Sequence, residues 1–106
     1  MNTSLIDRLR GQCGGPRDGA LLRFSLGSAL LDGGDHAAAI EELRRAVSFD
    51  PNYSAAWKLL GKACLAVQDE AGAAEAWRQG IAVARQRGDK QAEKEMTVFL
   101  RRIEGA

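Results

Sequence analysis

Side chains that usually carry catalysis or hold a metal are scarce in this chain. Its 106 residues include one histidine and two cysteines. His36 follows an aspartate that can cap a helix, so we interpret it as a surface residue. Cys13 and Cys64 are far apart and lack CxxC spacing, and with one histidine they do not form a convincing zinc site. The sequence therefore predicts no catalytic residue, no metal and no cofactor.

Long apolar runs and an excess of one charge are also missing. The chain has no stretch of 18 apolar residues, and its first residues, MNTSLIDRLRGQ, lack the apolar segment of a signal peptide. Fifteen basic and fourteen acidic residues leave a net charge of +1, which gives no reason to expect nucleic-acid or membrane binding. We expect free thiols and a cytoplasmic protein.

Proline and β-branched residues are few, whereas Ala and Leu are abundant, which favours helix almost throughout. Breaks are predicted where Gly, Pro and Asp cluster. Asp35, Asp69 and Asp89 each follow such a break or form part of it, and we expect them to cap the next helix. The predicted helices lie near residues 3–11, 18–31, 36–48, 53–67, 70–86 and 90–104.

A 34-residue repeat lies within this pattern. Residues 20–53 and 54–87 share nine identities: Leu26/Leu60, Gly27/Gly61, Ala29/Ala63, Leu31/Leu65, Asp35/Asp69, Ala37/Ala71, Ala39/Ala73, Glu41/Glu75 and Arg44/Arg78. Chance would give about two. A helix–turn–helix period of this length is typical of the tetratricopeptide repeat, TPR. The chain resembles TPR proteins over about 70 residues.

The resemblance extends to the positions that pack helices in this family. The second copy matches at Trp57, Leu60, Gly61, Ala73, Trp77 and Gly80, and the first at Leu26, Gly27, Leu30, Ala39, Leu43, Ala46 and Pro51. The glycines let paired helices approach closely, and Trp57 is expected to lock one hairpin onto the next. Arg23 replaces a large apolar residue, so we expect it to be partly solvated. Arg85 replaces a proline, so its helix should continue to Gly88.

The ends should complete the core, because two repeats are few for a solenoid. Leu5, Ile6 and Leu9 are expected to cover the first repeat. The last helix carries an apolar stripe, which aligns with the repeat only if the register shifts by two residues and Met96 takes the conserved Leu site. We therefore predict an all-α solenoid of two TPR repeats with a C-terminal capping helix. The predicted domains are 1–17, a short helix and Gly-rich loop, and 18–106, the TPR domain.

For function, the resemblance implies protein–protein recognition on the concave face formed by the first helix of each repeat. The inward positions are Leu21, Phe24, Ser28, Leu31, Asp32, Ala55, Lys58, Lys62, Leu65, Ala66, Gln91, Lys94, Val98, Arg101 and Arg102. We expect the ligand to contact Phe24, Ser28, Lys58, Lys62, Leu65, Lys94, Arg101 and Arg102. Some TPR proteins clamp a C-terminal carboxylate with Lys, Arg and Asn, although no Asn occupies these sites here.

These residues predict a non-enzymatic adaptor or chaperone-like module that binds a peptide or helix, acidic or C-terminal, of another protein. Three alternatives stay open. The charges are only solvated, or Leu5, Ile6 and Leu9 fill the apolar end of the face. In the third, the chain is a structural subunit that self-associates as a homodimer without a separate peptide ligand. A further interpretation, nucleic-acid binding through the basic residues, lacks the clustered aromatic residues and the strong net charge that such binding usually needs. Cys13, in the Gly-rich loop, could be an exposed thiol with a redox role.

Overall fold

Six helices follow one another in the computed structural model, which describes residues 3–105. They are α1 (Thr3–Gln12), α2 (Ala20–Asp32), α3 (His36–Phe49), α4 (Ser54–Ala66), α5 (Glu70–Arg87) and α6 (Lys90–Ile103). The described residues contain no strand, so the all-α prediction is confirmed, with helix ends within one or two residues of those expected. The predicted domain limits at residues 1 and 106 lie outside the described part, and a division at residue 17 stays a prediction.

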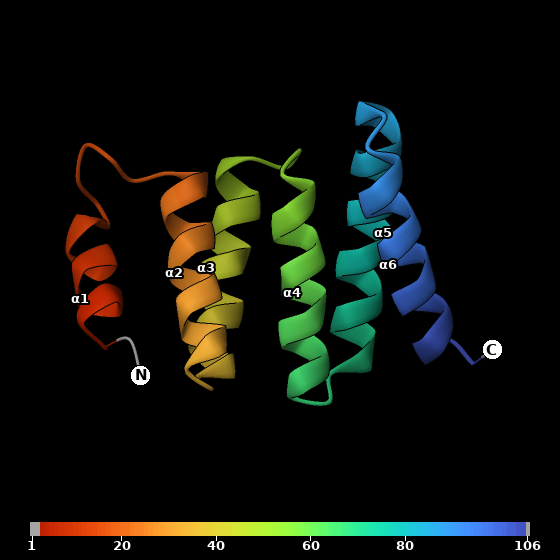
Figure 1. The fold of residues 1–106 in the computed structure, drawn as a ribbon, viewed down its shortest axis with the longest axis horizontal. Coiled ribbons are helices and arrows are strands. Elements are labelled where there is room, and N and C mark those ends of the chain that lie inside the picture. Colours follow the sequence, from red (N-terminus) through yellow and green to blue (C-terminus); the bar gives the residue numbers. More distant parts are fainter. Residues whose placement is uncertain (1–2, 106) are drawn as a thin grey trace.

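The helices form two layers (Figure 1). α2, α4 and α6 lie in the nearer layer, and α3 and α5 lie behind them. α2 pairs with α3 and α4 pairs with α5, while α3 joins the two hairpins by packing against α4. α1 lies at one end against α2, and α6 lies at the other end against α5 and α4. The chain is therefore a short solenoid with an added helix at each end.

Three aspartates begin helices as the sequence predicts. The side-chain Oδ1 atoms of Asp35, Asp69 and Asp89 accept hydrogen bonds from the backbone N–H groups three residues further on, at 3.3, 2.9 and 3.1 Å. Each bond satisfies a helix N–H that would otherwise lack a partner. These caps fix where α3, α5 and α6 start, and so fix the turns between helices.

Glycines allow the paired helices to approach closely. A Cβ atom at Gly27 would lie 2.7 Å from Cγ of Leu43, and one at Gly61 would overlap the indole of Trp77. Leu43 and Trp77 are both buried in the core. The predicted role of Gly27 and Gly61 in close helix packing is therefore confirmed, and each works by making room for one large side chain of the second helix.

Trp57, which is expected to lock one hairpin onto the next, lies at the edge of the core. Its side chain is only partly buried, and its Nε1 donates a hydrogen bond to the carbonyl oxygen of Pro51 at 2.8 Å. The ring lines a surface hollow together with Val47 and Ala76. Trp77 is the deeply buried tryptophan, with 1% of its surface exposed. Trp57 nevertheless packs against a core cluster that has members in both hairpins.

α1 covers the first hairpin, as expected. Ile6 is buried in a cluster with Leu26 and Leu30 of α2, and Leu5 and Leu9 pack against the same cluster. This contact takes the place of a preceding repeat, which would otherwise bury that side of α2.

The register shift at the C-terminal end is also confirmed. α5 continues to Arg87, and Gly88 ends it with a left-handed φ of 74°. Met96 of α6 is fully buried, and a Cβ atom at Gly80 would collide with its sulfur. Because α5 extends past the site of the replaced proline, α6 begins two residues late and presents Met96 to the core.

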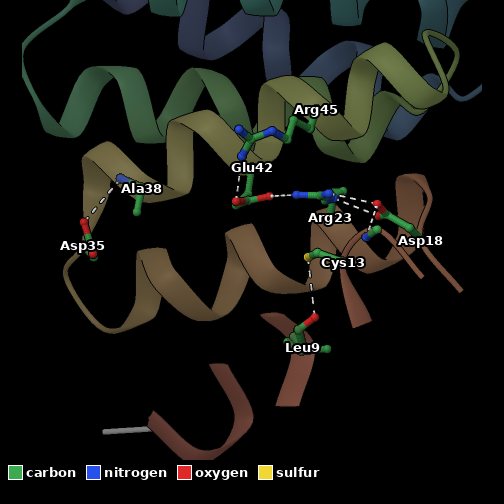
Figure 2. Close-up of polar contacts among 9 residues, drawn as sticks. Leu9, Cys13, Asp18, Arg23, Asp35, Ala38, Glu42 and Arg45 are labelled. Carbon is green, nitrogen blue, oxygen red and sulfur yellow. Dashed lines mark hydrogen bonds and ion pairs between the residues drawn. The ribbon is translucent and has the colours of Figure 1, made fainter. Parts of the chain in front are cut away.

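Arg23 is partly exposed, as expected, but its charge is paired within the chain rather than left to solvent. Only 13% of its side chain is exposed. Nε and Nη2 donate to both carboxylate oxygens of Asp18, and Nη1 donates to Glu42, each at 2.8 Å. Glu42 also accepts from Arg45, which completes a network between α2, α3 and the loop before α2 (Figure 2). Asp18 of this loop thus neutralises Arg23, which stands where the family usually has a large apolar residue.

Asp18 should make stability depend on pH. The Arg23 guanidinium, with a hydrogen bond from the Gly14 N–H, holds the pKa of the Asp18 carboxyl well below its usual range. A carboxyl with a lowered pKa stabilises the fold above its unfolded-state pKa of about 4. That stabilisation is lost as the pH falls towards the folded-state pKa. We therefore expect Asp18→Asn to lower the urea midpoint at neutral pH, with a smaller difference from the parent in acid.

Asp32→Asn provides the control for this measurement, because Asp32 lies exposed at the end of α2 and forms no ion pair with another described residue. A difference between Asp18→Asn and the parent that stayed constant from neutral pH to strongly acidic pH would contradict the assignment.

Candidate protein-binding face

All eight predicted ligand-contact residues lie on the three helices of the nearer layer. Phe24 and Ser28 belong to α2, Lys58, Lys62 and Leu65 to α4, and Lys94, Arg101 and Arg102 to α6. We call the surface formed by α2, α4 and α6 the first-helix face. α4 contacts both α2 and α6, so the three helices adjoin along it.

Lys58 is already paired within the chain. Its Nζ lies 2.9 Å from Oε1 of Glu95 on α6. The ion pair with Lys58, with a hydrogen bond from Gln91, lowers the pKa of the Glu95 carboxyl. Lys58, which is predicted to contact a ligand carboxylate, is therefore bound to Glu95 in this structure, and its role in ligand binding stays a prediction. The reason is the two-residue shift of α6, which brings Glu95 opposite Lys58.

Lys62 also faces α6, but through a ring rather than a carboxylate. Its Nζ lies 5.2 Å from the centre of the Phe99 ring, within the range of a cation–π contact. Phe99 in turn lies 5.3 Å from the ring of Trp77, so the core fixes its position. Lys62 stays exposed and keeps its ammonium hydrogens available.

Four cations on the C-terminal half of the face form no ion pair with another described residue. They are Lys62, Lys94, Arg101 and Arg102. All four are exposed. By contrast, Arg78 and Arg85, which lie on α5, pair with Glu104 and Glu93. The first-helix face therefore carries exposed positive charges that form no ion pair with another described residue.

Among the apolar residues predicted to contact the ligand, Phe24 is less exposed than expected. Phe24 is partly buried, and its ring lies 5.0 Å from that of Tyr53. Leu21, Leu65 and Val98 are exposed, at 70%, 37% and 38%. α1 packs against α2 on the side of Leu26 and leaves Leu21 uncovered. Exposed apolar side chains thus accompany the cations on α4 and α6.

Two hollows lie away from the predicted contact residues. One, of about 380 Å³, is lined by Arg23, Arg45, Ser48 and Phe49. The other, of about 340 Å³, lies between α3, α4 and α5, and its lining includes Cys64. Burial raises the pKa of the Cys64 thiol, which disfavours a reactive thiolate there. Neither hollow is lined by a residue that the sequence predicts to contact the ligand.

Cys13 is partly buried just beyond the end of α1. Its thiol donates to the carbonyl oxygen of Leu9 at a sulfur–oxygen distance of 3.6 Å. A redox role for it stays a prediction.

Within residues 3–105, no group of three or more His, Cys, Asp or Glu side chains is placed to hold a metal. None of the helices described there is long and apolar enough to cross a membrane.

Comparison with known proteins identifies the repeat. The tetratricopeptide repeat family model matches residues 20–63. A TPR repeat-containing protein of Pseudomonas aeruginosa, PA0015, is 62% identical over 89 residues, which span 84% of this chain and 85% of the relative. The heat-shock protein cognate co-chaperone sgt12 of Aspergillus fumigatus is 36% identical over 73 residues, 69% of this chain but only 21% of that protein.

A solved structure agrees with these matches. The solution structure of protein BPP2914 from Bordetella parapertussis has a TM-score of 0.80 and 45% identity, and the match covers 94% of this chain and 87% of that one. The helix order, the repeat period and the relatives all agree, and this chain belongs to the tetratricopeptide repeat family, a non-enzymatic fold of protein–protein interaction.

Proposed function

We propose that this chain is an adaptor or chaperone-like module, without catalytic activity, that binds an acidic segment of another protein on its first-helix face. The observation that supports the proposal is the cluster of exposed cations Lys62, Lys94, Arg101 and Arg102, which have no ion-pair partner among the described residues. Exposed Leu65 and Val98 lie among them. A segment that carries both carboxylates and apolar side chains complements this surface.

The spacing of the residues favours one continuous binding surface. Lys94, Val98 and Arg101 follow one another at about one-turn intervals along α6, and Lys62 and Leu65 do so along α4. Lys62 reaches across to Phe99, so the α4 and α6 sets adjoin. Charges and apolar groups can therefore meet a single partner segment.

The energies involved require several contacts. An exposed ion pair contributes only about 0.2–1 kcal/mol. Binding therefore needs the cations to act together with burial of Leu65 and Val98, at about 25 cal/mol per Å² of apolar surface. We expect modest affinity that weakens as salt concentration rises, because the ion pairs are screened.

Two further observations support a chaperone-like role and a cytoplasmic location for the protein. The Aspergillus relative bears the name of a co-chaperone, although this chain matches only a fifth of it. Cys13 and Cys64 are both free thiols, which accords with the cytoplasmic location predicted from the sequence.

Reversing two charges on the face tests the proposal. The probe is a fluorescein-labelled eight-residue peptide of alternating leucine and aspartate with a free C-terminal carboxylate, followed by fluorescence polarisation. We expect Lys62→Glu with Arg101→Glu to weaken binding by about tenfold or more, because two attractions become repulsions, and tenfold corresponds to about 1.4 kcal/mol. Circular dichroism should show an unchanged fold, since both side chains are exposed.

The matched control is Arg8→Glu with Arg44→Glu, which makes the same change in net charge on α1 and α3. An equal loss in both double variants would indicate attraction to net charge alone and would contradict the proposed face. Failure of the parent protein to bind the peptide would contradict the acidic ligand.

A further inference from the structure

The carboxylate of Glu95 pairs with Lys58, one of the residues predicted to contact a ligand on the first-helix face. It comes from α6 and lies 2.9 Å from Nζ of Lys58. One turn further along both helices, Lys62 lies over the Phe99 ring. α6 thus brings one anion and one aromatic ring to the two lysines of α4.

The contact with Lys58 is open to exchange. The Lys58 and Glu95 side chains are 30% and 37% exposed, so water and a competing carboxylate can reach both. The other oxygen of Glu95 accepts from Gln91 on the same helix at 3.3 Å, so Glu95 keeps a hydrogen bond if Lys58 leaves. When the pair opens, Glu95 keeps the bond from Gln91 and the partly exposed Lys58 ammonium can be hydrated, which keeps the cost of opening small.

We propose that Glu95 is an internal competitor for ligand carboxylates at Lys58 and so limits how tightly acidic segments bind. The inference rests on the acidic-segment function proposed above. When a ligand carboxylate reaches Lys58, the Lys58–Glu95 pair opens and Glu95 turns to Gln91 and solvent. A ligand without a carboxylate at that point leaves the pair closed and binds through the other cations alone.

The charge of Glu95 also acts on Lys62. The two lysines are one helical turn apart, and Glu95 lies close enough to Lys62 for its carboxyl pKa to be lowered by that charge as well. Removing the charge therefore frees Lys58 and raises the positive potential around Lys62.

Glu95→Gln tests this inference with the leucine–aspartate peptide. We expect it to bind the peptide about three- to fivefold more tightly than the parent, a change of about 1 kcal/mol or less. The control is Glu93→Gln, which removes the same charge from the same helix. Glu93 pairs with Arg85 of α5 at 2.9 Å, and we expect its variant to bind as the parent does.

Lys58→Ala completes a double-mutant cycle. In the parent background it should weaken binding little, because Lys58 is already occupied. In the Glu95→Gln background it should remove most of the gained affinity, because the freed ammonium is the source of that gain.

The possible results separate the two proposals. Equal binding by parent and Glu95→Gln would overturn the role of Glu95 and leave the acidic-segment function standing. Equal gains in Glu95→Gln and Glu93→Gln would show a general charge effect and would also overturn it. No binding by the parent or any variant would overturn the acidic-segment function, and the role of Glu95 with it.

Discussion

Trp77→Ala is expected to lower the free energy of unfolding by about 3–5 kcal/mol, the usual cost of truncating a buried aromatic side chain. Trp77 is 1% exposed and packs against Phe99 of α6. Its Nε1 also donates to the backbone carbonyl of Lys58 at 3.1 Å. The total free energy of unfolding of a small domain is only about 5–15 kcal/mol, so the variant should melt at a much lower temperature than the parent. Urea titration followed by circular dichroism measures the loss.

Trp57→Ala provides the comparison for this result. The two tryptophans have the same size, but Trp57 is only partly buried and bonds to Pro51 at the surface. The decrease in the free energy of unfolding should be clearly smaller for Trp57→Ala than for Trp77→Ala. Equal losses for the two variants, or a larger loss for Trp57→Ala, would show that the burial described here does not govern stability in solution.

Gly61→Ala is expected to destabilise the protein by about 1–3 kcal/mol, as overpacking in a core does. The added methyl group would overlap the indole of Trp77. The ring has little freedom to move, because Phe99 lies against it and Lys58 accepts its N–H. The clash should exceed the gain in helix propensity of about 1 kcal/mol that Ala normally brings.

Gly11→Ala is the matched control for Gly61→Ala. Gly11 lies near the end of α1, and a Cβ atom there would have no atom within 4 Å apart from its chain neighbours and the backbone of its own helix. The same substitution should therefore stabilise the protein by about 0.4–1 kcal/mol, because it reduces the freedom of the unfolded chain. Thermal unfolding of both variants would show opposite shifts. A stabilising shift in Gly61→Ala would rule out the close α4–α5 contact.

Most of the fold could be predicted from local signals. Each of the caps Asp35, Asp69 and Asp89 depends on a few consecutive residues, since the side chain bonds to an N–H three positions on. The glycine and large-residue positions repeat at 34 residues because each hairpin buries the same kind of surface. The missing proline at Arg85 predicted the longer α5, and the apolar stripe of the last helix predicted the position of Met96.

Two packing details did not follow from the repeat. Arg23 was expected to be partly solvated because no repeat precedes it, but its ion pair with Asp18 of the preceding loop was not predicted. The path of that loop depends on how α1 docks, and no local signal defines this. Trp57 matches a core position of the family, yet its exposure depends on how much side-chain volume α3 and α5 place around it.

For the candidate site, the sequence predicted which helices carry the residues but not which of their charges are paired. Helical spacing placed all eight residues on the first helices of the hairpins and on α6, because a helix repeats its faces every three to four residues. It did not reveal that Glu95 meets Lys58. That contact joins two helices 37 residues apart in the chain, and Glu95 was not among the positions expected to face a ligand.

The amino-acid sequence alone determined the helices, their caps, the 34-residue period and the family. These features depend on contacts within one helix or between consecutive helices, which residue type and spacing encode directly. Tertiary structure alone decided which charges are paired and which stay exposed, as Arg23 with Asp18 and Lys58 with Glu95 show. Long side chains reach several partners, so the partner chosen depends on distances of a few ångströms between separate helices, which only packing fixes.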